Sequence, residues 1–490
     1  LLKSRQSWVL ASTPQGQTSS DMFPEGLVTD NIGNGMNRAR ISWYVIDPLF
    51  YRNNNLTPDH WGTEEQSFDF SRLVLEQEIF PNRQNLNQGQ QTNLPIFDVA
   101  YFPNEKGPYN YDADGTDQEG IVRAAGLEND GKLKDPASRW GGIMRAINTS
   151  DFEENNIEFI QFWMMDPFAN DPLDLHSGGD LYFNLGLVSE DILRDGRQSF
   201  ENGYPSPSNP DLPTDTTAVA IVPDFQRINN AFDVDPQARP FQDLGFDGMS
   251  DAQELEHHSF GTSSYVAKLN SLGLTPAAYD KLIADVSSDN FLYYRRDEWD
   301  AQEASVLERY KFFNGLENNS PTANQTGTSF QASSSILPDV EDINRDNQTY
   351  KSESYFQYKV SMRKQDLEVG KNYITDEVVG SGQLANGQNI TTTWYQFKIP
   401  VRDPDKVVGD IQDFRSIQNL RMYFKNFEDS IVTRFARLEL VRGEWRRYLF
   451  SLGEPGEAIP GDPSGGAPFD ISVVNIEENG VKDPINYILP

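Results

Sequence analysis

The stretch DFEENNIEFIQFWMMDPF (residues 151–168) and, after an acidic, turn-rich gap, the stretch GDLYFNLGLVSED (179–191) decide the fold. From Asn156 to Asp166 the residues first alternate between polar and apolar and then become continuously apolar, which predicts a β-strand buried on both faces. Leu181 to Leu187 is rich in aromatic and aliphatic residues, which predicts its partner strand. A strand that is covered on both faces lies inside a sheet, so we expect this pair at the centre of the fold.

A similar arrangement returns near the C-terminus, where DFRSIQNLRMYFKNF (413–427) precedes TRFARLELVRGEWRRYLF (433–450). In both copies an Asp-Phe pair leads into a strand rich in Phe, Tyr and Met, and a Trp-containing segment lies upstream, with Trp140 in the first copy and Trp394 in the second. The pattern predicts a degenerate internal repeat. If the copies are equivalent, Trp163 and Tyr423 occupy matching places in matching sheets.

Other segments add strand and helix signals. Apolar and β-branched runs predict strands at QSWVLAST (6–13), RARISWYVIDPLFY (38–51), LPIFDVAYFP (94–103), YFQYKVSM (355–362) and DISVVNIEENG (470–480). RLVLEQEIF (72–80) predicts a short helix, and SEDILRDGRQSFENG predicts a helix that Ser189 caps and Gly203 ends. Further helical signals lie at 250–260, 263–274, 275–286 and 298–313.

The order of these signals predicts a mainly β protein made of two jelly-roll-like antiparallel β-sandwich domains. We expect a first sandwich at 1–203, a mixed connector with short helices at 204–351, a second sandwich at 352–450, and a C-terminal loop and strand at 451–490 that leads onward in a longer chain. The chain opens on LLKSRQSW without an initiator Met and stops on NYILP, which also indicates a piece of a longer protein.

Composition excludes several classes of function. The 490 residues include 74 acidic and 41 basic side chains and carry a net charge of -33, which disfavours nucleic acid and anionic membranes and favours cations or basic partners. The absence of cysteine excludes disulfides, thiolate chemistry and cysteine-based zinc sites. No window approaches 18 apolar residues, so we expect no lipid-spanning helix in this chain.

Two acidic loops resemble the calcium-binding template that places oxygen ligands at positions 1, 3, 5, 9 and 12 of a loop. In DLGFDGMSDAQE the candidate ligands are Asp243, Asp247, Asp251 and Glu254, and Gly245 leaves position 3 without one. In DINRDNQTYKSE the candidates are Asp342, Asn344, Asp346 and Glu353, and Tyr350 is a poor ligand at position 9. The alternative for either loop is an Asx turn that caps a helix or strand, so calcium is a possible rather than a required cofactor.

Catalytic motifs are absent from the sequence. The four histidines, His60, His176, His257 and His258, lack the spacing of metal ligands, and no nucleophile elbow, P-loop or dinucleotide-binding motif occurs. Carboxylate pairs for glycoside hydrolysis can be chosen anywhere in so acidic a chain, so no pair is singled out. We therefore predict that the protein is not an enzyme.

Long strings across the chain resemble a known family: NRARISWYVIDPLFY, FDVAYFPNEKGPYNYD, RWGGIMR, DFEENNIEFIQFWMMDPF, LYFNLGLVSEDILRDGRQSFENG, DLGFDGMSDAQE, LPDVEDINRDN, WYQFKIPVRDPDKVVGDI and RFARLELVRGEWRRY. They are similar, in this order, to the SprA family, also called Sov, the outer-membrane translocons of the type IX secretion system with a role in gliding motility. Family members are far longer than this chain, which corresponds to an interior part of them.

The resemblance implies a non-enzymatic part of a giant outer-membrane β-barrel that exports folded proteins. The implied partners are a PorV-like outer-membrane shuttle protein, a periplasmic plug protein and cargo with a C-terminal sorting domain. The implied location is the cell surface of the outer membrane, as an extracellular cap or a part of the lumen, and we favour the cap. The alternative from another class is a surface carbohydrate-binding, possibly calcium-dependent, β-sandwich module.

Overall fold

The computed structural model describes residues 2–17, 22–54, 57–81, 93–171, 173, 175–201, 211–224, 244–290, 292–313, 339–443, 450–452 and 458–460. Within them, two six-stranded antiparallel sheets dominate, and the prediction of a mainly β fold is confirmed. Sheet A has the order β1 (Val9–Leu10), β4 (Trp140–Ala146), β13 (Asn419–Lys425), β6 (Gly179–Leu187), β9 (Ser354–Met362), β12 (Lys406–Val408). Sheet B has the order β10 (Ile374–Gln383), β11 (Asn389–Pro400), β5 (Ile157–Met165), β14 (Ile431–Arg442), β3 (Phe97–Lys106), β2 (Ala39–Tyr44).

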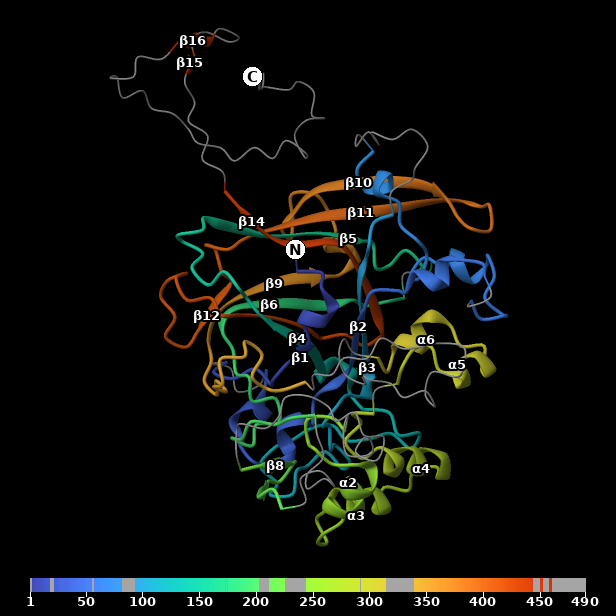
Figure 1. Cartoon of the computed structure of the whole chain (residues 1–490), viewed down its shortest axis with the longest axis vertical. Helices are drawn as coiled ribbons and strands as arrows, with labels where there is room; N and C mark the ends of the chain where they lie inside the picture. The colour runs from blue at the N-terminus through green and yellow to red at the C-terminus, as the bar shows by residue number, and fades with distance from the viewer. Residues whose placement is uncertain are drawn as a thin grey trace.

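The two sheets face each other across one hydrophobic core, and Figure 1 shows β10, β11 and β5 in a layer above β9 and β6. Phe162 of β5 lies in this core, with its ring centroid 5.6 Å from that of Phe183 of β6. The next residue on β5, Trp163, points to the opposite face of sheet B and packs with Trp394 and Ile79. The sequence-based prediction of a strand buried on both faces is confirmed for β5.

Eight of these strands follow the chain order of a jelly roll. Strands β3, β5, β11 and β14 lie in sheet B, and β4, β6, β9 and β13 lie in sheet A, so successive strands cross repeatedly between the sheets. Strands β1, β12, β10 and β2 extend the two sheets at their edges. The fold is thus one jelly-roll sandwich with two additional strands on each sheet.

This topology differs from the expected pair of separate sandwiches. Each sheet combines strands from residues 1–203 with strands from residues 352–450, so neither segment forms a sandwich by itself. The expected pairing of β5 with β6 is also wrong, because β5 pairs with β11 and β14 while β6 pairs with β13 and β9. The apolar runs correctly indicated burial, but burial on both faces does not specify which strand lies alongside.

The internal repeat is visible in a different form. Strand β5, with Trp163, is third in sheet B, and β13, with Tyr423, is third in sheet A. Strand β4, with Trp140, is second in sheet A, and β11, with Trp394, is second in sheet B. The two copies therefore occupy corresponding places when the sheets are exchanged, within a single sandwich.

Helices cover the outside of the sandwich and fill part of the connector. The α-helices are α1 (Glu76–Ile79), α2 (Asp251–His257), α3 (Tyr265–Ser271), α4 (Pro276–Ala284), α5 (Asp297–Ala301) and α6 (Val306–Tyr310). The short 3-10 helices are η1 (Arg5–Ser7), η2 (Pro24–Leu27), η3 (Ile32–Gly35), η4 (Pro48–Tyr51), η5 (Glu65–Ser67), η6 (Pro136–Ser138) and η8 (Lys364–Asp366). Two small strand pairs, β7 (Thr214–Thr216) with β8 (Ile221–Pro223) and β15 (Phe450–Leu452) with β16 (Ala458–Pro460), complete the elements. The strand predicted at 470–480 lies outside the described residues.

The helix predicted at 189–203 does not form in the described residues 189–201. The buried Glu341 side chain accepts hydrogen bonds from the backbone N–H groups of Ile192, Leu193 and Ser199, at 2.6, 3.0 and 2.9 Å. Arg194, at φ +56°, leaves the helical region of backbone space. These three amides therefore donate to a carboxylate that is remote in sequence. Their bonds to Glu341 take the place of the backbone hydrogen bonds of a helix.

In the part of the chain that the structure describes, no helix has both the length and the apolar character needed to cross a membrane.

Candidate functional site

Two segments bring five carboxylates together beside α2 and α4, at the bottom of Figure 1. We call Asp247, Asp251, Glu254, Asp285 and Asp289 the acidic cluster. Carboxylate oxygens of Asp247, Glu254 and Asp289 lie within 4.8 Å of one another. The same holds for Asp251, Glu254 and Asp285, so Glu254 joins the two groups.

The local sequence explains how α2 presents its share of the cluster. Gly248, at φ +66°, makes the turn before the helix, and the Ser250 N–H donates to the Gln253 side chain at 3.0 Å as part of a capping box. Asp251 opens the first turn of α2, and Glu254 follows three residues later. Residues at this spacing lie on the same face of a helix, which places both carboxylates on one side.

The second segment is the turn that follows α4. Asp285 ends this helix, and the backbone N–H of Asp289 donates to its carboxylate at 3.1 Å. Within the same turn, Ser287 donates through its backbone N–H to Glu254 at 2.9 Å and through its hydroxyl to Asp247 at 2.8 Å. Ser287 therefore holds the two segments of the cluster against each other.

Burial makes the acidic cluster electrostatically costly. Desolvation raises the pKa values of Glu254 and Asp247. The negative charges of Asp251 and Asp285 raise both pKa values further. Lys106 lies nearby, and burial lowers its pKa to about 7, although the carboxylate of Asp285 acts in the opposite direction. Several buried carboxylates at this separation hold protons or require a cation, because like charges in a desolvated site do not all ionise.

The donor set suits a hard cation. All five side chains offer oxygen, and two ligands on opposite sides of a calcium ion stand about 4.6–5.2 Å apart, since each Ca–O distance is about 2.3–2.6 Å. The oxygens of each group lie within 4.8 Å of one another, so one ion of that size can be reached by all three carboxylates of a group. Asp247, Asp251 and Glu254 were predicted as ligands from the sequence, whereas Asp243 lies outside the described residues.

The arrangement differs from the contiguous calcium loop that the template predicted. Asp247 precedes α2, Asp251 and Glu254 stand on this helix, and Asp285 and Asp289 come from the DVSSDN turn instead of the predicted loop. Sequence reasoning missed these two residues. The available signal was that DVSSDN (285–290) repeats the spacing of DLGFDG (243–248), with acids at the first and fifth positions and Asn or Gly at the sixth.

The second predicted loop forms a turn that its own side chains close. The Asp342 carboxylate accepts from the backbone N–H groups of Asp346 and Asn347, at 3.0 and 2.7 Å, and the Asn344 side chain accepts from Asp346 N–H at 2.9 Å. These are the bonds of an Asx turn, which was the alternative stated for this loop. Within the described residues, no group of three close carboxylates includes Asp342, Asp346 or Glu353 of this loop.

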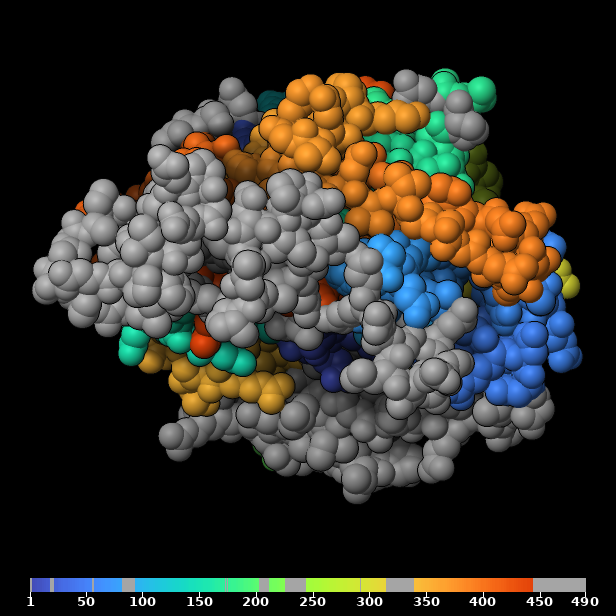
Figure 2. Space-filling model, turned by 90° about the horizontal axis from the view of Figure 1, so that it is seen from above, coloured from blue at the N-terminus to red at the C-terminus, as the bar shows by residue number. Residues whose placement is uncertain are grey.

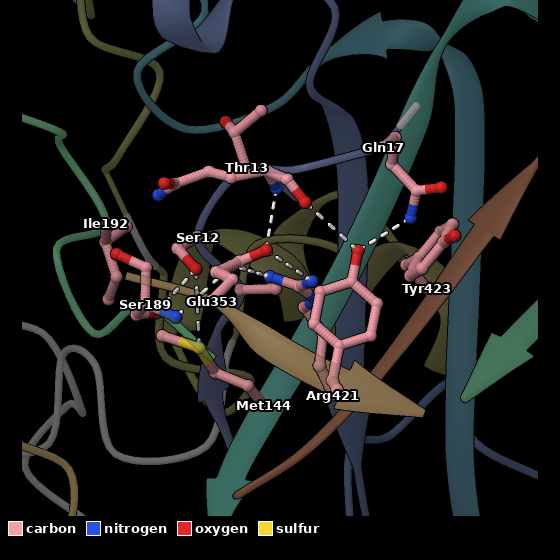
Figure 3. Close-up of polar contacts among 12 residues, drawn as sticks. Ser12, Thr13, Gln17, Met144, Ser189, Ile192, Glu353, Arg421 and Tyr423 are labelled. Atoms are coloured by element: carbon pink, nitrogen blue, oxygen red, sulfur yellow. Dashed lines mark hydrogen bonds and ion pairs between the residues drawn. The ribbon is translucent and has the colours of Figure 1, made fainter. Parts of the chain in front are cut away.

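Glu353, the last ligand predicted for that loop, lies in another environment, shown in Figure 3. Its carboxylate forms a buried ion pair with Arg421 of β13, with Oε2 3.1 Å from Nη2. It also accepts from the backbone N–H groups of Gln15 and Ser189, at 2.7 and 3.2 Å. Glu353 thus ties the N-terminal segment and the chain after β6 to sheet A, in place of ligating a metal with Asp342.

Comparison with known proteins finds a family whose profile matches the C-terminal part of the chain. Residues 264–490 match the profile of SprA_N, described as motility related/secretion protein. Over this range the match agrees with the resemblance of the chain to the SprA family. No curated protein matches the chain. The SprA_N match begins just before α3 and includes strands β9 to β14, which supply half of both sheets.

Proposed function

We propose that the chain is a non-enzymatic part of an outer-membrane translocon of the type IX secretion system, which also serves gliding motility. The observation that carries this proposal is the SprA_N match together with the topology. Strands β9 to β14 lie in the matched range and share both sheets with β1 to β6, which lie outside it. Because each sheet combines strands from both ranges, we extend the secretion-related role to the residues before 264.

Buried ion pairs indicate a bracing role for the sandwich. Arg421 pairs with Glu353, Arg434 of β14 pairs with Asp98 of β3 at 2.9 Å, and all four side chains are essentially inaccessible to solvent. Arg139 similarly pairs with Asp112 at 2.8 Å. Each pair joins segments that are distant in sequence, which suits a rigid structural element beside a transport path.

We place this element at the cell surface of the outer membrane, as the extracellular cap of the translocon. The net charge of -33 supports this role, because a strongly acidic surface keeps passing chains from adhering through nonspecific contacts. The proposed partners are a PorV-like shuttle protein, a periplasmic plug protein and cargo with a C-terminal sorting domain. The carbohydrate-binding alternative rests on fold analogy alone, since lectin domains also adopt jelly rolls.

We also propose that the acidic cluster takes up calcium and thereby fastens α2 to the turn after α4. Its support is the all-oxygen donor set and the separation of its carboxylates, which matches one ion per group. This role is structural, and the secretion proposal stands without it.

A bacterial strain that encodes the full-length parent protein provides the test of the secretion role. Trp163→Asp places a charge in the apolar layer under α1 and unfolds the sandwich, whereas Glu428→Lys changes an exposed turn residue and serves as the control. We expect the first variant to lose export of sorting-domain cargo and gliding, and the second to retain both. Only strains with normal amounts of the protein in the outer-membrane fraction are compared. Normal export with a protease-sensitive, unfolded sandwich would overturn the proposal.

A further inference from the structure

The free edges of the two sheets are of unequal length and exposure. Among the described strands, sheet A ends on β1 and β12, which have two and three residues, and sheet B ends on β2, whose six residues are all buried. The remaining edge, β10, has ten residues and alternates between covered and exposed positions. Figure 2 shows the β10–β11 hairpin, in orange, at the surface. Proteins usually shorten or cover such edges, because an open edge pairs with other strands.

Backbone geometry identifies the groups that β10 leaves open. The Leu384 N–H donates to the Gln388 carbonyl at 2.8 Å across the hairpin, and the register with β11 is regular from Asp376 to Gln383. Because backbone groups alternate in direction along an antiparallel strand, Gly382, Gly380 and Val378 turn theirs toward β11. The odd-numbered residues Glu377, Val379, Ser381 and Gln383 turn their N–H and C=O groups outward, and of these the Glu377 N–H donates to the Asp376 carboxylate at 3.0 Å.

The same four residues carry the exposed side chains of β10. All four are exposed, and Val379 is 61% exposed, an unusual position for a β-branched apolar residue. On the other face, Gly380 lies against Glu78 of α1, where an added Cβ would stand 2.4 Å from the Glu78 carbonyl oxygen. Among the described residues, helix α1 therefore covers one face of β10, and no strand pairs with its outer edge.

Charge indicates the kind of strand that would fit. Strand β10 carries Asp376 and Glu377 and has no basic residue, and no ion pair to either acid occurs among the described residues. A second copy of this chain, with its net charge of -33, is repelled at long range. A cationic β-strand instead gains a cross-strand charge pair opposite Glu377 and an apolar neighbour for Val379.

We propose that β10 is a docking edge for an extended cationic peptide segment of a partner protein, which adds as a further strand of sheet B. The outward C=O groups from Glu377 to Gln383 and the outward N–H groups of Val379, Ser381 and Gln383 supply the affinity. The exposed acid and valine supply the preference for basic and β-branched side chains. This inference does not depend on the secretion role, because it follows from the edge itself.

The test uses the full 490-residue chain and a nine-residue synthetic peptide in which lysine alternates with valine and threonine. We expect saturable binding by fluorescence anisotropy and, on binding, slower hydrogen exchange at the amides of Val379, Ser381 and Gln383. Glu377→Lys lowers the affinity roughly fivefold, because it replaces an attractive cross-strand pair by a repulsive one. Glu428→Lys makes the same change in net charge at an exposed turn and leaves the affinity unchanged.

The lack of cysteine allows a positional readout. Ser381→Cys and Ser259→Cys each introduce one exposed thiol, on β10 and on the loop before α3 respectively. We expect a peptide whose one cysteine carries an activated mixed disulfide to exchange with the thiol at position 381, releasing the small thiol, and not with the thiol at position 259. Binding without protection of the β10 amides, equal cross-linking at both positions, or no binding would each overturn the proposal. Dimerisation of the chain that Glu377→Lys abolishes would also overturn it, because the occupant would then be a second copy.

Discussion

Phe162 of β5 and Phe183 of β6 lie close in the sequence but face each other from opposite sheets, with ring centroids 5.6 Å apart. Phe162 also stacks on Phe397 of β11 at 4.6 Å and meets Phe435 of β14 edge-on at 5.4 Å. One phenyl ring therefore touches both neighbouring strands and the facing sheet, at the point where the two halves of the chain interleave.

Phe162→Ala is expected to lower the free energy of unfolding by about 3–5 kcal/mol, because it opens a cavity in a fully buried aromatic cluster. Urea unfolding followed by fluorescence and by circular dichroism measures this change. Leu175→Ala, at a side chain that is 75% exposed, is the control and is expected to change the free energy by less than about 0.5 kcal/mol. A loss confined to one of two separate transitions would contradict the single sandwich.

A double-mutant cycle on Glu353 and Arg421 tests the buried ion pair. Glu353→Gln and Arg421→Met each leave a charge without its partner in a dry environment and are expected to cost about 3–5 kcal/mol. The double variant is expected to cost less than the sum of the single variants, since it removes both charges. Additive single costs would show that the pair is not coupled.

Calcium binding is tested by isothermal titration calorimetry and by thermal melting with and without chelator. The full chain is expected to release heat with calcium and to melt at a lower temperature with chelator. Glu254→Gln is expected to remove the response, because Glu254 belongs to both carboxylate groups, and Asp346→Asn, in the Asx turn, is expected to retain it. A calcium response that survives Glu254→Gln would reject the acidic cluster as the site.

The pH dependence of stability has a predictable contribution from Glu190. Burial raises its pKa to about 7, so the folded protein keeps this proton between about pH 4.5 and 7 while the unfolded chain releases it. The contribution of Glu190 to stability is therefore complete below about pH 4.5 and is lost as the pH rises to 7. We expect the fall in melting temperature from pH 5 to pH 7.5 to be smaller in Glu190→Gln than in the unchanged chain, and an equal fall would contradict this assignment.

Local patterns in the sequence predicted many of the strands and helices. Residues 94–103 and 355–362 overlap β3 and β9, residues 151–168 contain β5, and the helical signals at 250–286 contain α2, α3 and α4. Apolar periodicity reports which residues are buried, so it succeeds where an element is defined by its own burial. It carries no information about the neighbour, which is why the pairing of β5 and the sharing of both sheets could not be predicted.

The remaining errors have one physical origin, in side chains that find partners remote in sequence. Glu341 takes the amides that a helix at 189–203 would have used. Arg421 draws Glu353 away from the loop in which the calcium template placed it. Asp285 and Asp289 reach the acidic cluster from the turn after α4. The sequence alone does not specify which of these remote side chains come into contact.

The pairing of β6 with β9 has a mechanical consequence. Leu187 at the end of β6 stands opposite Ser354 at the start of β9, so the whole segment from 188 to 353 leaves and re-enters the sandwich at one point. Tension that draws the two ends of this segment apart falls on the hydrogen bonds of the β6–β9 ladder one after another, beginning at Leu187, as in a zipper. The buried Glu353–Arg421 pair lies at that point and couples the first residues beyond the ladder to β13. The Glu353–Arg421 ion pair therefore resists force on this segment before the hydrogen bonds between β6 and β9 break.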